Sequence, residues 1–133
     1  MSTLHPRRPR DERGSAVVDF VLVLVVLVPL FLGIAQLALT LHVRNTLAAA
    51  ASEGARYAAA YDRSPGDGVA RTRERIRGAV AGRFAQHVGV GVESVGGAPT
   101  VVVTARAEVP ALGLWGPGVP IEVHGHATRE ELP

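Results

Sequence analysis

The sequence predicts an α+β protein. The expected fold is a long N-terminal helix that crosses a membrane and continues outside it, a second helix, and a small C-terminal antiparallel sheet. Three observations support this fold class. No charged side chain interrupts the stretch from Phe20 to Leu41. Apolar residues then recur every three or four positions as far as Tyr61, and from Gly89 onward the apolar period falls to two.

The apolar stretch is long enough to cross a bilayer, because about 20 helical residues span a hydrocarbon core of roughly 30 Å. It must be helical, since a lone strand cannot satisfy its backbone in lipid. Pro29 removes one backbone hydrogen bond, so we expect a kink or a looser turn there, to which Gly33 adds local freedom. Gln36 is polar and can hydrogen-bond to a neighbouring helix.

One helix is expected to continue from Ser15 to Tyr61, half inside the membrane and half outside. Glu53 and Arg56 are three residues apart and can pair on its exterior. The apolar face that this spacing predicts consists of Val43, Leu47, Ala50, Ala51, Gly54, Ala58 and Tyr61.

The remaining residues divide into a helix and three strands. Turn formers fill residues 62–68, and residues 69–87 are expected to form an Arg-rich second helix. Its predicted inner face consists of Val69, the stem of Arg73, Ile76, Val80 and Phe84. A short strand is expected at residues 90–95, followed by a turn at Gly96-Gly97. Strands at 100–109 and 121–128 alternate apolar and polar residues, and the loop between them holds Trp115.

Composition and charge exclude several classes of function. The chain has 133 residues, no cysteine, and a net charge of +2. Disulfides and thiolate metal sites are therefore excluded. Four arginines precede the span, as the positive-inside rule expects, whereas ten Arg face ten acids from Ser15 onward. With few aromatic residues available for base stacking, we expect no nucleic-acid partner.

The chain contains no recognisable catalytic or cofactor motif, so we expect no enzyme activity, no cofactor and no small-molecule substrate. His124 and His126 share one side of a strand, but without a third ligand they are expected to be surface residues, not a metal site. Arg71, Arg73, Arg75 and Arg77 alternate around a helix, which favours a solvated surface over contact with anionic lipid.

An acid stands at the start of the apolar stretch. Asp19 immediately precedes Phe20, and Gly14-Ser15 lie one turn upstream, after a short basic segment. A carboxylate costs about 2.5 to 3.5 kcal/mol at a membrane helix centre and less near its end, so it needs a compensating interaction. This arrangement resembles a type IV prepilin: a basic leader, a small residue before the cut, and an acid at the fifth mature position.

The resemblance implies cleavage between Gly14 and Ser15 by a prepilin peptidase at the cytoplasmic membrane face. The flexible glycine is expected to lie just outside the helix, so that the backbone can enter the peptidase. The cut would leave a charged amine on Ser15. Asp19 could then pair with the amine of a neighbouring subunit inside an apolar bundle, which would offset the cost of burying both charges.

A longer region resembles the TadE-like family, pseudopilins of the tight-adherence (Tad, or Flp) pilus system. The resemblance covers about residues 12–60: Arg13 to Phe20, the span with Pro29 and Gly33, and residues 43–45 leading to 52–58. Its most specific part is the run that includes Glu53, Gly54, Arg56 and Tyr57. The family usually carries Glu at the acid position, where this chain has Asp19.

The resemblance implies a type IV pilin-like fold and a minor pilin that supports assembly of a Tad-type pilus or a related secretion apparatus. Residues 1–14 would be a cytoplasmic leader, 15–61 the transmembrane and extended helix, and 62–133 an exported α+β domain. The partners would be membrane lipid, prepilin peptidase, other pilins and Tad inner-membrane proteins. The mature chain would either stay in the cytoplasmic membrane or join an extracellular pilus.

Two other interpretations of the span remain open. A secretory signal peptide could be cut near Ala35 or Ala38, although its apolar core is usually only about 7–15 residues long. An uncleaved anchor is the second, because an acid at a helix start is also an ordinary partner of the helix dipole. In that case the chain would be a membrane-tethered binding or adhesion module with no pilus role.

Overall fold

A computed structural model describes residue 2, residues 10–112, residue 116 and residues 118–130 of the chain. The helices are α1 (Arg10–Ala59) and α2 (Pro65–Ala79), followed by a short 3₁₀ helix η1 (Gly82–Ala85). The strands are β1 (His87–Val95), β2 (Ala98–Val109) and β3 (Val119–Thr128). The predicted α+β class is confirmed. Trp115 and most of the expected leader lie outside the described residues.

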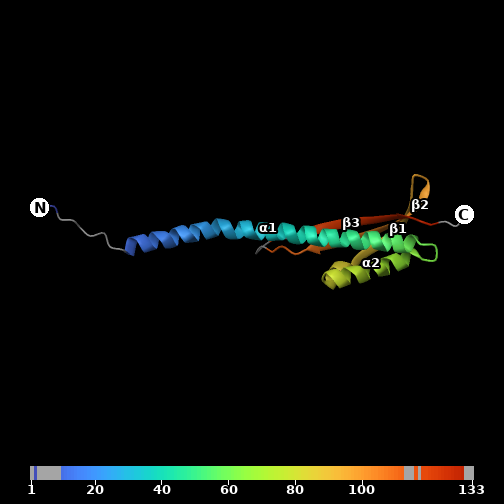
Figure 1. Ribbon diagram of the computed structural model, residues 1–133, viewed down its shortest axis with the longest axis horizontal. Coiled ribbons are helices and arrows are strands. Elements are labelled where there is room, and N and C mark those ends of the chain that lie inside the picture. The colour runs from blue at the N-terminus through green and yellow to red at the C-terminus, as the bar shows by residue number, and fades with distance from the viewer. Residues whose placement is uncertain (1, 3–9, 113–115, 117, 131–133) are drawn as a thin grey trace.

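Helix α1 sets the elongated shape of the molecule (Figure 1). Its 50 residues would measure about 75 Å at 1.5 Å per residue. The N-terminal half projects alone, whereas α2 and the sheet pack along the C-terminal half (Figure 1). One helix therefore joins an uncovered rod to a small folded domain.

The bounds of α1 differ from the prediction at both ends. The helix begins at Arg10, so Gly14 and Ser15 lie inside it, and the expectation of a glycine just outside the helix is wrong. It runs without interruption through Pro29 and ends at Ala59, whose carbonyl accepts a hydrogen bond of 3.0 Å from the Glu130 backbone N–H. Because the helix ends there, Tyr61 leaves the apolar face and is 64% exposed.

Helix α2 begins four residues earlier than predicted because Ser64 and Asp67 form a capping box. The Ser64 hydroxyl accepts a bond from the Asp67 backbone N–H at 3.3 Å, and the Asp67 carboxylate accepts one from the Ser64 N–H at 2.8 Å. This backbone hydrogen bond holds the pKa of Asp67 below its usual value. Pro65 occupies the first helical turn, where its missing N–H costs nothing.

The C-terminal end of α2 was also predicted wrongly. The helix stops at Ala79 because Val80 is extended, and the chain then forms η1 before entering β1. Phe84 is buried as expected, but it reaches the core from η1 and not from the helix. Val69 and Val80 are only partly buried at the edge of that core.

The three strands form an antiparallel meander in the order β1-β2-β3. Gly96 and Gly97 connect β1 to β2, and both have positive φ angles (60° and 84°), as a tight two-residue hairpin of type I′ requires. The predicted alternation of apolar and polar residues in β2 and β3 is confirmed, since one side of these strands is buried against α1. The buried side chains on this face include Val101, Val103, Ala105, Val109, Ile121 and Val123.

The core is thin and depends on backbones that approach closely. A Cβ atom at Gly54 of α1 would overlap the Thr72 hydroxyl and lie 2.7 Å from the Gly68 carbonyl oxygen. One at Gly68 would lie 2.6 Å from the Cβ of Ala58. On the other side of α1, a Cβ at Gly125 of β3 would overlap the backbone of Ala51. Glycine is therefore required where α2 and β3 meet α1.

We predict that Gly54→Ala lowers the free energy of unfolding by about 1 to 3 kcal/mol, because the added methyl group forces α1 and α2 apart. Gly78→Ala is the matched control. Gly78 lies in α2, and a Cβ there meets nothing within 4 Å, so this change should be neutral or stabilising by up to about 1 kcal/mol. Thermal unfolding of the full chain in detergent, followed by circular dichroism, measures both; equal midpoints would contradict the close packing.

Candidate functional site

The most unusual surface of the molecule is the uncovered half of α1. In the part of the chain that the structure describes, this is the one helix long and apolar enough to cross a membrane. None of the residues in its most apolar stretch of 18 is buried. Val26 is 70% exposed and Phe31 is 69% exposed. Contiguous apolar surface of this extent marks a site of contact with lipid or with other proteins.

Gly14, Ser15 and Asp19 lie together on the first turns of this rod. Ser15 and Asp19 are four residues apart, so they share one face of the helix. Asp19 is exposed among apolar neighbours, with Val18 at 57% and Phe20 at 63% exposure. The fold thus places the predicted cleavage residues and the predicted charge-pair residue at the far end of the molecule from the folded domain (Figure 1).

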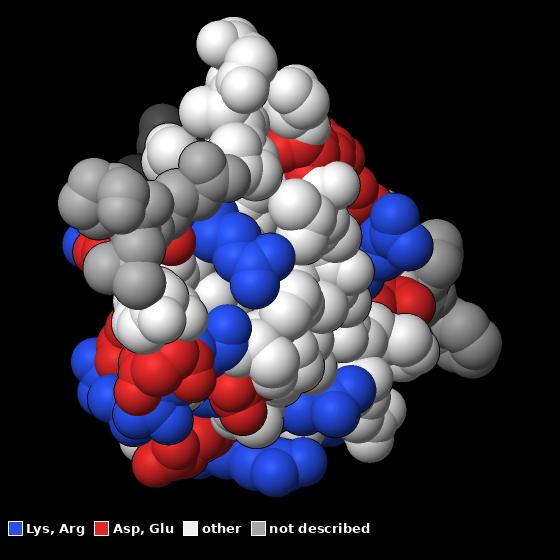
Figure 2. All heavy atoms as spheres, turned by 90° about the vertical axis from the view of Figure 1, so that its right-hand side faces the viewer, with Lys and Arg blue, Asp and Glu red and all other residues white. Residues whose placement is uncertain are grey.

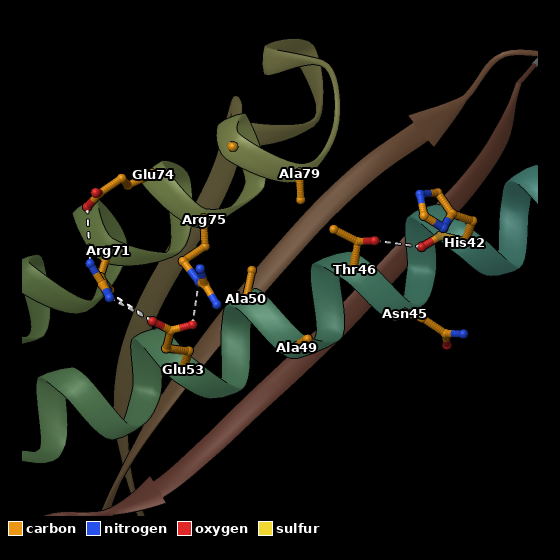
Figure 3. Close-up of a pocket in the computed structure, with 11 residues that line it drawn as sticks. His42, Asn45, Thr46, Ala49, Ala50, Glu53, Arg71, Glu74, Arg75 and Ala79 are labelled. Carbon is orange, nitrogen blue, oxygen red and sulfur yellow. Dashed lines mark hydrogen bonds and ion pairs between the residues drawn. The ribbon is translucent and has the colours of Figure 1, made fainter.

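The Glu53 carboxylate is bound by two arginines of α2, as Figure 3 shows. The Arg71 guanidinium donates to one oxygen, with N···O distances of 2.9 and 3.1 Å, and the Arg75 Nε donates to the other at 2.5 Å. The predicted pair with Arg56 is therefore wrong, because the Glu53 side chain points toward α2. Arg71 and Arg75 are one helical turn apart, which is why both reach the same acid.

These contacts shift the pKa values of the groups involved. Burial tends to raise the pKa of Glu53, but the hydrogen bonds from Arg75 and Arg71 outweigh it and leave the pKa below its ordinary value. The hydrogen bond that Arg71 donates to Glu53 raises the pKa of Arg71. Both groups are therefore charged at neutral pH.

Other residues of the same run also hold α2 in place. Tyr57 lies beneath the guanidinium of Arg63, at 4.6 Å from the ring centroid, and that of Arg71 at 5.8 Å. Gly54 provides the close approach described above. Arg56, by contrast, is exposed. The run 53–57 is thus chiefly a seam that docks α2 onto α1.

Sequence reasoning missed the α2 side of this seam. The Thr72 hydroxyl is fully buried and donates to the Gly68 carbonyl at 2.8 Å, with the Ala50 carbonyl at 3.4 Å. The signal was the spacing of Gly68 and Thr72, two small residues one helical turn apart that match the spacing of Ala50 and Gly54 on α1.

An open groove of about 690 Å³ lies next to this seam, between α1 and the C-terminal half of α2 (Figure 3). His42, Asn45 and Thr46 line one end and the Glu53–Arg75 pair the other. The Thr46 hydroxyl donates to the His42 carbonyl of its own helix at 2.9 Å. Among the described residues, no group of three or more His, Cys, Asp or Glu side chains is placed to hold a metal ion.

His124 and His126 lie on the outer face of the sheet, with ring centroids 6.3 Å apart. His124 contacts the Thr104 hydroxyl through Nδ1 at 3.0 Å and the Glu122 carboxylate through Nε2 at 3.2 Å. Glu122 also accepts a bond of 2.6 Å from Arg106. Acidic and basic side chains are similarly mixed at the end of the molecule seen in Figure 2, especially on the side where α2 lies. This is the polar surface of a solvated domain.

These features define a class of protein: a long helix with a bare apolar half, a candidate membrane span, that carries a small polar α+β domain. A family model described as TadE-like protein matches residues 14–56, which confirms the resemblance drawn from the sequence. The match begins at Gly14 and includes Asp19, Pro29 and the first residues of the seam. The family is structural and pilus-associated. No curated protein and no solved structure matches the chain.

The ion pairs of Glu53 with Arg71 and Arg75 should make the stability of the folded domain depend on pH. A carboxyl group whose pKa is lowered by folding stabilises the folded state above its unfolded pKa of about 4.3 and loses that contribution as the pH falls through the folded value. We therefore expect the native chain to lose more stability between pH 7 and pH 3 than Glu53→Gln does. Glu93→Gln, which neutralises an exposed acid of β1, is the control. Denaturant unfolding at the two pH values measures the difference; identical losses for the native chain and Glu53→Gln would contradict it.

Proposed function

We propose that the chain is a membrane-anchored pseudopilin that supports the assembly of a Tad-type pilus or a related secretion apparatus. The observation that carries this proposal is the bare apolar half of α1, which lies within the segment matched by the TadE-like model and has Asp19 at its start. A rod of this kind has two environments that would cover it, a bilayer and a bundle of similar helices.

In this proposal the N-terminus lies in the cytoplasm and the α+β domain is exported. Four arginines precede the apolar stretch, and such residues favour the cytoplasmic side. The Arg71 and Arg75 side chains near the folded end are already engaged by Glu53, so they act as parts of the domain and not as determinants of topology.

Prepilin peptidase would cut between Gly14 and Ser15. Because both residues are helical, the first turns of α1 must open for the backbone to enter the peptidase. A glycine inside a helix lowers its stability by about 1 kcal/mol relative to alanine, and helix ends open most easily. Gly14 thus weakens the helix at the place where it must open.

Assembly would then depend on the new amine of Ser15 and on Asp19 of an adjoining subunit. The exposed apolar side chains bring helices together, and the charge pair fixes their axial register at a modest net energy. Pro29 and Gly33 would let the rod bend between these helices, since Pro29 removes one hydrogen bond of the helix and a Cβ at Gly33 would meet nothing within 4 Å.

N-terminal sequencing of the membrane-bound chain should show that it begins at Ser15. Gly14→Leu should block the cut, because a bulky residue replaces the flexible one, and Gly33→Leu should not, because that glycine lies far along the same helix with open space around it. A mature chain that begins at Met1 would instead favour the uncleaved tether, and one that begins after Ala38 would favour a secretory signal peptide.

Asp19→Ala should leave membrane insertion intact and reduce co-purification with other pilus components at least about tenfold, the factor that corresponds to 1.4 kcal/mol. Asp19→Glu keeps the charge, and Glu is the residue usual in the family, so it should restore the association. Quantitative pull-down of the tagged native chain and of the two variants measures the association. Undiminished co-purification of the alanine variant would remove the charge pair from the proposal.

A further inference from the structure

The loop between β2 and β3 is tied to the apolar half of α1 through Gln36. The Gln36 amide nitrogen donates to the Pro110 carbonyl at 3.3 Å, and its amide oxygen accepts a bond of 2.6 Å from the Leu112 N–H. This Gln36 clasp differs from the expected bond to a neighbouring helix. One side chain satisfies both a donor and an acceptor of the loop backbone.

The clasp lies at the depth where the span should leave the hydrocarbon. About 20 residues counted from Phe20 cover roughly 30 Å and end near Leu39. Gln36 precedes Leu39 by three residues, which places the clasp about 4.5 Å inside this boundary. Leu39 already packs against the core of the folded domain, so the domain begins where the bilayer ends.

Irregular backbone at this depth needs internal hydrogen-bond partners, because lipid offers none. The clasp supplies them for Pro110 and Leu112. At the other end of the loop, the Gly118 N–H donates to the Glu108 carboxylate at 2.9 Å. Pro110, Ala111 and Leu112 carry no charge, and Leu112 is 43% exposed. The chemistry of these three residues therefore matches the boundary between headgroups and hydrocarbon.

We propose that residues 110–112, where the β2–β3 loop begins, contact the bilayer surface: Leu112 enters the interface of the leaflet that α1 is leaving, and Gln36 holds the backbone of these residues in place. The partner is the lipid itself. This inference rests on the proposed function, because it requires α1 to span the membrane. It assigns these residues the role of fixing the height and orientation of the exported domain above the membrane.

The absence of cysteine makes the test direct. Val26→Cys, Leu112→Cys and Glu93→Cys, each in the full chain, carry a nitroxide probe in nanodiscs of phosphatidylcholine and phosphatidylglycerol. Collision rates with oxygen and with a water-soluble nickel chelate report depth. Val26 lies inside the span, about 9 Å from its start at Phe20. Glu93 lies near the β1–β2 hairpin, at the end of the molecule opposite the N-terminus (Figure 1).

We expect the Leu112 probe to fall between the two controls in its ratio of oxygen to nickel collisions. Adding Gln36→Leu should shift that ratio toward the value at Glu93, because the loop is released. Adding Thr40→Val should not, since Gln36 itself makes both hydrogen bonds of the clasp and Thr40 accepts a separate bond from the Gln36 amide nitrogen.

Three results would overturn the inference, and they are distinguishable. An aqueous Leu112 probe beside a lipid-buried Val26 probe would place the loop in water and leave the span intact. A Leu112 signal that disappears when the chain is diluted in lipid would assign the loop to a second copy. An aqueous Val26 probe would contradict the proposed function itself.

Discussion

An uncovered apolar helix cannot remain in water, and this constraint governs the rest of the molecule. Each exposed Val, Leu or Phe of the rod would contribute about 1.5 to 3 kcal/mol on full burial. The charged surface of the domain requires water instead. Because one continuous helix joins the apolar rod to this charged domain, a boundary between an apolar and an aqueous medium would satisfy both surfaces.

The folded domain is built to hold that helix rigidly with little apolar material. Its core relies on alanine and valine more than on large side chains. Stability therefore comes from close backbone approach at Gly54, Gly68 and Gly125, where dispersion contacts are dense. The Glu53 bridge then fixes which face of α2 meets α1. A rigid junction of this kind would transmit the orientation of the rod to the domain.

Local patterns predicted most of the fold, and contacts distant in sequence account for what was missed. Length and periodicity were sufficient for α1 and for the alternating strands β2 and β3, while Gly96-Gly97 located the hairpin. The start of α2 was missed because Ser64 and Pro65 are typical both of turns and of helix starts. The partners of Glu53 lie 18 and 22 residues away, and those of Gln36 lie 74 and 76 residues away. The spacing of residues within α1 therefore contains no information about the partners of Glu53 or of Gln36.

The most direct measurement of the central claim is extraction of the chain from cell membranes with alkaline carbonate, compared with extraction by detergent. We expect the chain to stay in the membrane pellet after carbonate and to be released only by detergent, because its apolar half lies in lipid. A full-length chain that appears in the carbonate supernatant, and stays monomeric there without detergent, would contradict it.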